Sequence, residues 1–113
     1  MKLKFVLRIK CDCFQKKEID RILTMSSCDD DDDWELELVE VESDPPIDFV
    51  DVFLNILNEN CYHLNEVGIQ KKDMSIWIYY EYDQQCNMEF LPDQMKRLGE
   101  NGIVLCISCW KSE

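Results

Sequence analysis

The sequence predicts an α+β protein: a two-layer sandwich with a mainly antiparallel four-stranded sheet, helices on one face, and the element order βαβαβαβ. Strand-like and helix-like segments alternate along the chain. The helices are few and short, and the strands carry polar side chains on one side, which is typical of a sheet with one face in water. The length of 113 residues and a hydrophobic content of 46% fit one domain, residues 1–113.

Residues 2–11 alternate between apolar and mostly basic side chains, which predicts a half-buried strand with a basic face. Residues 14–25 place their apolar side chains near one stripe and predict a short helix. Residues 26–33 predict an exposed loop, because adjacent aspartates repel one another and Asp is poor in helix and strand. Residues 34–42 predict a second strand, in which a bulge near Leu38–Val39 accounts for a slip in the alternation.

A capping residue followed by prolines at 43–46 predicts the start of a helix over 47–60. Residues 61–72 are predicted to be a connector that turns at Gly68. Pro92 opens another short helix, which we expect to end near Gly99 or Gly102.

The strongest predicted strand covers residues 74–82, with Trp77, Tyr79 and Glu81 on the face opposite its aliphatic residues. Residues 103–110 predict the last strand. Their apolar density indicates a central position in the sheet, covered on much of both faces. A sheet with helices on one side leaves the other side available for binding.

The most informative feature for function is the run Asp29–Asp33, which leads directly into Trp34. The chain has 24 acidic and 12 basic side chains, a formal net charge of −12. Such a chain repels nucleic acid and anionic membranes and attracts basic surfaces. The run therefore predicts a docking site for a basic protein, although a loop that only aids solubility has the same composition. A calcium site is disfavoured, because the ligand spacing and the turn glycine are missing.

The predicted partner-binding residues form two groups. The first is the acidic run with the strand after it, where Trp34 is the expected anchor, and the second is the outer face of the strand over 74–82, which is either interface or core. Stacking of nucleic-acid bases on this strand is disfavoured by its neighbouring carboxylates. The residues are Asp30, Asp31, Asp32, Asp33, Trp34, Glu35, Glu37, Trp77, Tyr79 and Glu81.

The chain contains seven cysteines, an odd number, and it opens with no secretory signal. We therefore expect the protein to be located in the reducing cytoplasm. Cys106 and Cys109 fall three apart on a predicted strand and point to opposite faces, which disfavours zinc. His63 is the only histidine, and no Gly-rich phosphate loop is present. We therefore expect no metal, no cofactor and no catalysis. A small enzyme built on His63 stays an alternative.

Three segments of the C-terminal part carry a resemblance to a known family: Ser75–Tyr80, Glu89–Leu98 and Gly102–Trp110. In order they give a strand, a short helix that ends in Leu-Gly, and a terminal strand that ends in an aromatic residue. This pattern resembles a family of small bacterial proteins of unknown function, which are similar to the immunity members of toxin–immunity pairs, including those of contact-dependent inhibition. The resemblance implies binding and no catalytic residue.

Together these observations predict a cytoplasmic immunity protein, acting as a monomer or in a 1:1 complex, that occludes the active site of a basic toxin domain such as a nuclease. Two alternatives stay open. One is a phage-encoded inhibitor that imitates nucleic acid, and the other is a structural or adaptor protein that self-associates through its open sheet face.

Overall fold

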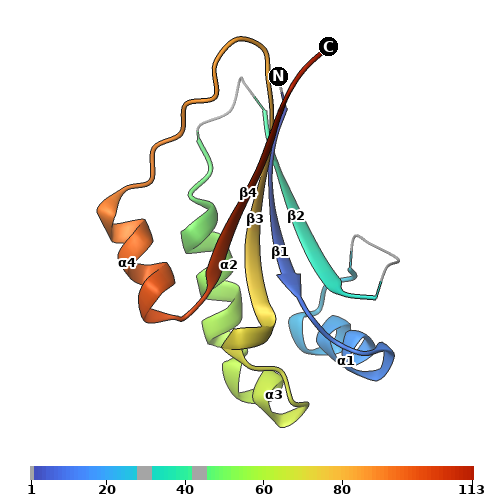
Figure 1. Ribbon diagram of the computed structural model, residues 1–113. Coiled ribbons are helices and arrows are strands. Elements are labelled where there is room, and N and C mark those ends of the chain that lie inside the picture. The colour runs from blue at the N-terminus through green and yellow to red at the C-terminus, as the bar shows by residue number, and fades with distance from the viewer. Residues whose placement is uncertain (1, 28–31, 42–45) are drawn as a thin grey trace.

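The computed structural model describes residues 2–27, 32–41 and 46–113, which form a four-stranded sheet with helices packed against one face (Figure 1). The α+β class is therefore confirmed. No helix within these ranges is both long enough and apolar enough to span a membrane. The strands are β1 (Lys2–Ile9), β2 (Trp34–Glu40), β3 (Met74–Tyr82) and β4 (Val104–Lys111). The helices are α1 (Cys13–Leu23), α2 (Phe49–Glu59), α3 (Cys61–Glu66) and α4 (Pro92–Glu100).

The sheet is mixed and not purely antiparallel, so the prediction of a mainly antiparallel sheet is confirmed only in part. Its strand order is β2-β1-β3-β4; β1 pairs antiparallel with β2 and β3, whereas β4 pairs parallel with β3. The parallel pair arises because the chain returns through α4 before β4 begins, as in a βαβ crossover (Figure 1). The predicted connector over 61–72 contains α3 and a 3-10 turn at Lys71–Asp73, so the order is not strictly βαβαβαβ.

The last strand is at an edge of the sheet, and its predicted central position is wrong. Apolar residues are equally compatible with an exposed edge, and only the pairing order distinguishes the two. The predicted bulge is also wrong, because β2 pairs with β1 without interruption from Trp34 to Glu40. The alternation of apolar and charged residues along β2 breaks at Val39 because this apolar side chain lies on the sheet face away from the helices, where it is 57% exposed.

Two aspartates cap the first two helices. Asp12 Oδ1 accepts a hydrogen bond from the Gln15 backbone N–H (2.7 Å), and Gln15 Oε1 accepts one from the Asp12 N–H (3.0 Å). Asp48 Oδ1 accepts from the Asp51 N–H (3.1 Å) and begins α2. The predicted start at Ser43–Pro46 lies largely outside the described residues, and the helix itself starts at Phe49.

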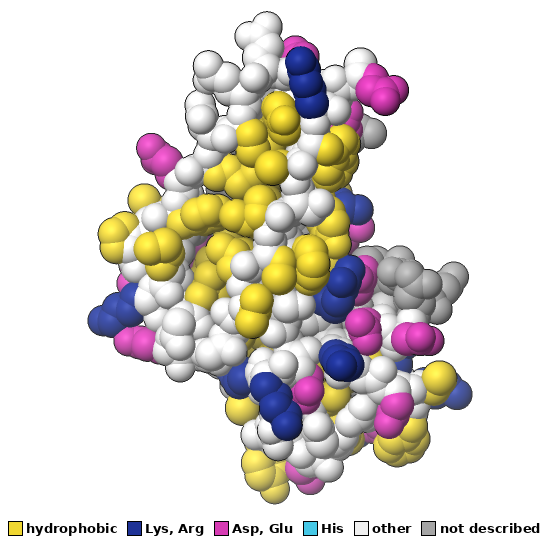
Figure 2. Space-filling view, in the orientation of Figure 1, with side chains coloured by type: hydrophobic (Ala, Val, Ile, Leu, Met, Phe, Trp, Pro, Cys, Tyr) yellow, Lys and Arg dark blue, Asp and Glu magenta, His cyan; other side chains and the backbone are white. Residues whose placement is uncertain are grey.

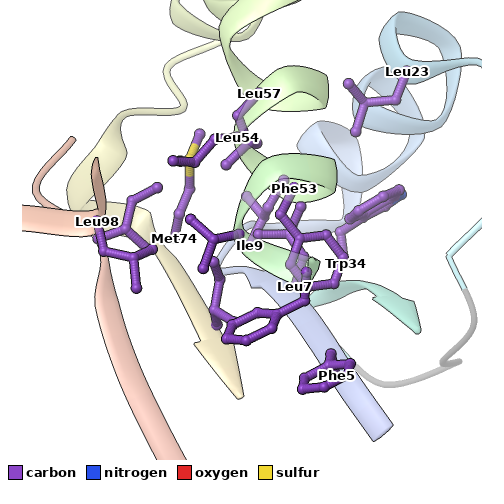
Figure 3. Close-up of a cluster of buried hydrophobic side chains, with 14 of the residues drawn as sticks. Phe5, Leu7, Ile9, Leu23, Trp34, Phe53, Leu54, Leu57, Met74 and Leu98 are labelled. Atoms are coloured by element: carbon purple, nitrogen blue, oxygen red, sulfur yellow. The ribbon is translucent and has the colours of Figure 1, made fainter. Parts of the chain in front are cut away.

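The core lies between the sheet and the helices, and Trp34 is one of its largest side chains (Figure 3). The Trp34 indole is fully buried, and its Nε1–H donates to Asp20 Oδ1 of α1 at 2.8 Å. The same oxygen accepts the Ser27 N–H at 3.1 Å. Each helix adds apolar side chains to this cluster, which buries the helix-side residues of β1 and the first half of β3.

Replacing Asp20 with alanine should lower the free energy of unfolding by about 1–3 kcal/mol, because the buried indole N–H of Trp34 would lose its acceptor. Asp20→Asn keeps an oxygen at this position and should cost less. Urea unfolding of both variants measures the difference. Equal losses for the two variants, or no loss for either, would argue against this role of Asp20.

Candidate functional site

The open sheet face, as we call the side of the sheet that no described helix covers, consists of alternate residues from all four strands. Strand pairing brings residues far apart in sequence into shared rows; Arg8, for example, lies between Glu35 and Ser75. The residues of the open sheet face within the paired strands are Lys4, Val6, Arg8, Glu35, Glu37, Val39, Ser75, Trp77, Tyr79, Glu81, Val104, Cys106, Ser108 and Trp110.

An aromatic pair forms the centre of the open sheet face. The rings of Trp77 and Tyr79 are stacked, with centroids 5.9 Å apart. Val6 lies beside Trp77 in the adjacent strand and is only 2% exposed, although no helix covers it. The side chains of the open sheet face therefore pack against one another and form a second, smaller apolar layer. The prediction that Trp77, Tyr79 and Glu81 share a face is confirmed.

Arg8 connects this aromatic pair to a carboxylate. Its Nε–H donates to Glu35 Oε1 at 2.8 Å, its Nη2 donates to the Tyr79 hydroxyl at 3.2 Å, and its Cζ lies 4.9 Å from the Trp77 ring centroid. Burial alone would lower the pKa of the Arg8 guanidinium, but the hydrogen bond and charge of Glu35, together with Tyr79, raise that pKa above its ordinary value. Arg8 therefore stays positively charged and is paired with the Glu35 carboxylate.

Lys4, two rows away on the same face, also lies near a carboxylate and an aromatic ring. Its Nζ lies 3.4 Å from Glu37 Oε2 and 5.4 Å from the Tyr79 ring centroid. Among the side chains that the structure describes on this face, both cations thus have carboxylate partners, and Glu81 adds a third acid. The described charges of this face, three carboxylates and two cations, therefore sum to −1.

Replacing Arg8 with alanine should lower the free energy of unfolding by about 1–3 kcal/mol, because the Glu35 side chain, only 13% exposed, would lose its cation. Glu35→Gln in the same chain should recover part of this loss. A double-mutant cycle of the two substitutions should give a coupling of about 1 kcal/mol. Strict additivity would show that the two groups do not interact.

A hollow of about 530 Å³ indents the open sheet face at the end of the sheet where the two chain termini lie. Tyr79 and Trp110 give it aromatic walls, and Glu37 and Glu81 place carboxylates around it, with Lys4 as the one cation among its lining residues. A hollow with this lining can accept a long basic side chain, since the aliphatic stem would contact aromatic rings and the charged end would meet carboxylates. Sequence reasoning did not identify Trp110 or the two cations as members of this site.

The acidic run is only partly described. Asp30 and Asp31 lie outside the described residues, Asp32 is exposed, and Asp33 is half-buried where β2 begins. The Cys11 thiol donates to the Asp32 carbonyl oxygen (Sγ to O, 3.8 Å), which attaches this segment to the end of β1. The described part of the run therefore borders the open sheet face beside Glu35.

Trp34 does not belong to this surface, and its prediction as a partner anchor is wrong for the folded chain. In β2, Trp34 faces the helices, whereas Glu35 and Glu37 face the other way. The alternation of a strand places neighbouring residues on opposite faces, so an anchor and its flanking acids cannot share one surface. Trp77 and Tyr79 are the aromatic residues that do lie beside Glu35 and Glu37.

The cysteines and the histidine belong to no metal-ligand cluster in the described part of the chain. No three His, Cys, Asp or Glu side chains gather there in a way that could hold a metal ion. Cys106 and Cys109 lie on opposite faces of β4. Burial raises the pKa of the Cys11 thiol, which disfavours its thiolate. His63 is an exposed residue of α3 whose Nδ1 lies 3.1 Å from Glu66 Oε1.

A second hollow, of about 500 Å³, lies on the helix side between the sheet and the segment that leads into α4. Phe5 and Phe49, stacked with ring centroids 4.4 Å apart, form part of its wall, as do Met88 and Phe90. Neither this hollow nor the one on the open sheet face is lined by His63.

Fold and site together define a class: a two-layer α+β protein with helices on one side and, on the other, an open sheet face with an aromatic pair among charged side chains. Comparison with family models, curated proteins and solved structures gave no match to this chain. The assignment to this class therefore depends on the geometry alone.

Proposed function

We propose that this protein is a non-catalytic inhibitor of the immunity-protein kind. It binds a basic protein domain, such as the nuclease domain of a contact-dependent inhibition toxin, and blocks its active site. The observation that carries the proposal is the open sheet face, where the aromatic pair Trp77 and Tyr79 lies among carboxylates and the described cations already have acidic partners.

Charge supports a basic partner. The net charge of −12 attracts a basic domain at long range, which raises the rate of encounter. At contact, Glu37 and Glu81 are placed around the hollow where Lys or Arg side chains of the partner can bind. The described acids of the run, Asp32 and Asp33, extend the negative surface along the start of β2.

The aromatic pair supplies the apolar part of the binding energy. Trp77 and Tyr79 take the anchoring role that the sequence suggested for Trp34. Both rings are held by the contacts to Arg8 and Lys4, so little side-chain entropy is lost when a partner covers them. Occlusion of this kind requires no chemistry by the inhibitor, because the partner's own phosphate-binding cations become covered. An inhibitor that imitates nucleic acid would use the same surface for the same physical reason.

Capture of a partner by the tagged protein from a lysate of the source cell tests the proposal. The capture is run at low and at moderate salt, in parallel with the double variant Trp77→Ala/Tyr79→Ala, and read by mass spectrometry. We expect one basic polypeptide with the wild type, its loss with the variant, and slower association at higher salt. Recovery of no basic polypeptide, or equal recovery with the variant, would contradict the proposal.

A further inference from the structure

Strand β4 has an apolar surface that nothing in the described chain covers. It forms one edge of the sheet, and its only strand partner there is β3. Val104 on one face is 60% exposed, Ile107 on the other face is 46% exposed, and Trp110 is 46% exposed. Figure 2 shows apolar side chains gathered over β4 and along the neighbouring side of the molecule, where α4 exposes Leu91 at its start and Met95.

The opposite edge differs in the feature that normally blocks strand addition. β2 carries Glu35, Glu37 and Glu40 along seven residues, and charged side chains on an edge oppose pairing with another chain. β4 is eight residues long and carries one charged side chain, Lys111, at its end. The β2 edge of the sheet is therefore protected by charge, whereas the β4 edge is open to pairing with another strand.

The distribution of charge along the chain indicates which protein pairs with the β4 edge. Residues 92–111, which cover α4 and β4, contain two acidic and three basic side chains, a net charge of +1. Since the whole chain carries −12, the rest carries −13. A basic foreign protein would be drawn to that acidic remainder and away from β4. Two copies meeting at β4 would instead join strands that each carry one charged side chain in eight residues, while the glutamates of β2, at the opposite edge of each sheet, would stay apart.

We propose that β4 pairs with β4 of a second copy, antiparallel and about a two-fold axis, which would join two four-stranded sheets into one. Such an isologous contact places the same residues on both sides, so Val104, Ile107 and Trp110 of each copy become covered. Trp110 is also a wall of the hollow on the open sheet face, so the dimer would narrow that hollow from one side. Trp77 and Tyr79 lie on β3, one strand away from the β4 edge, and stay accessible. Each protomer of the dimer therefore still binds one partner, and this inference stands or falls independently of the proposed function.

The mass of the isolated full-length protein in solution tests this inference. We expect light scattering with a reductant present, at about 100 µM protein, to give twice the 13.5 kDa of one chain. The reductant is needed because Cys109 on β4 and Cys86 are both exposed free thiols, and exposed thiols can crosslink copies artificially. A monomer under these conditions would overturn the proposal.

Matched lysine substitutions locate the contact. The double variant Val104→Lys/Ile107→Lys should weaken the dimer at least about tenfold, because like charges would face each other across the two-fold axis. The control, Val39→Lys, changes an equally exposed valine on the opposite edge and should leave the dimer intact. A dimer that survives the β4 substitutions, or that is lost with Val39→Lys, would overturn the proposal.

Hydrogen exchange of the wild type covers the case in which the β4 variant fails to fold. Outward-facing amides of β4 should become more protected as protein concentration rises, whereas amides at the β2 edge should not change. Equal behaviour at the two edges would also overturn the proposal.

Discussion

Replacing Trp34 with alanine should lower the free energy of unfolding by about 3–5 kcal/mol. The indole is fully buried against the sheet and the helices, and its N–H is bonded to Asp20. The substitution removes both the apolar contact and the hydrogen-bond donor, and it leaves a cavity in the core beside α1. Urea or guanidinium unfolding followed by circular dichroism measures the change.

Phe14→Ala is the control for this prediction. Phe14 is an aromatic residue of α1 that is 67% exposed, so its removal should change the stability by less than about 0.5 kcal/mol. Similar effects of the two substitutions would show that Trp34 is not a core residue, and its earlier interpretation as a surface anchor would regain support.

Replacing Trp77 or Tyr79 with alanine should weaken binding of the captured basic partner by about 30-fold or more, which corresponds to about 2 kcal/mol each. Both rings occupy the centre of the open sheet face, where a partner would exclude water from them. The loss should appear mainly as faster dissociation, because the charges that steer association remain. Surface plasmon resonance separates the two rates.

Tyr62→Ala is the matched control for the binding experiment. Tyr62 is an exposed tyrosine of α3, on the helix side of the molecule. Its removal should leave both rates unchanged. If Tyr62→Ala weakened binding as much as Tyr79→Ala does, the partner would bind the helix side and not the open sheet face.

Local patterns predicted most elements of the fold. The alternation over β1 and β3, the cap at Asp12 and the proline that begins α4 all act over a few residues, and the helices and strands they predicted are present. Strand order was not predictable in this way, because pairing joins residues far apart in the chain. The apolar residues of β4 are compatible with a central strand and with an unprotected edge, and the exposed edge is the one observed.

The site was partly predictable for the same reason. Alternation alone placed Trp77, Tyr79 and Glu81 on one face, and it also placed Lys4 and Arg8 together. That these two sets meet depends on β1 lying next to β3, which no local pattern encodes. The prediction for Trp34 was wrong because it followed from the neighbouring acidic residues. The alternation of side chains along β2 instead turns Trp34 toward the helices.

The indole N–H resonances of the three tryptophans provide the most direct test of a binding site on the open sheet face. Each resonance can be assigned with a Trp→Phe variant and followed while the captured basic partner is added. We expect the Trp77 resonance to shift or broaden. The resonance of Trp34, which is buried on the helix side with its N–H bonded to Asp20, should stay in place. A partner that binds without perturbing Trp77 would show that the binding site does not lie on the open sheet face.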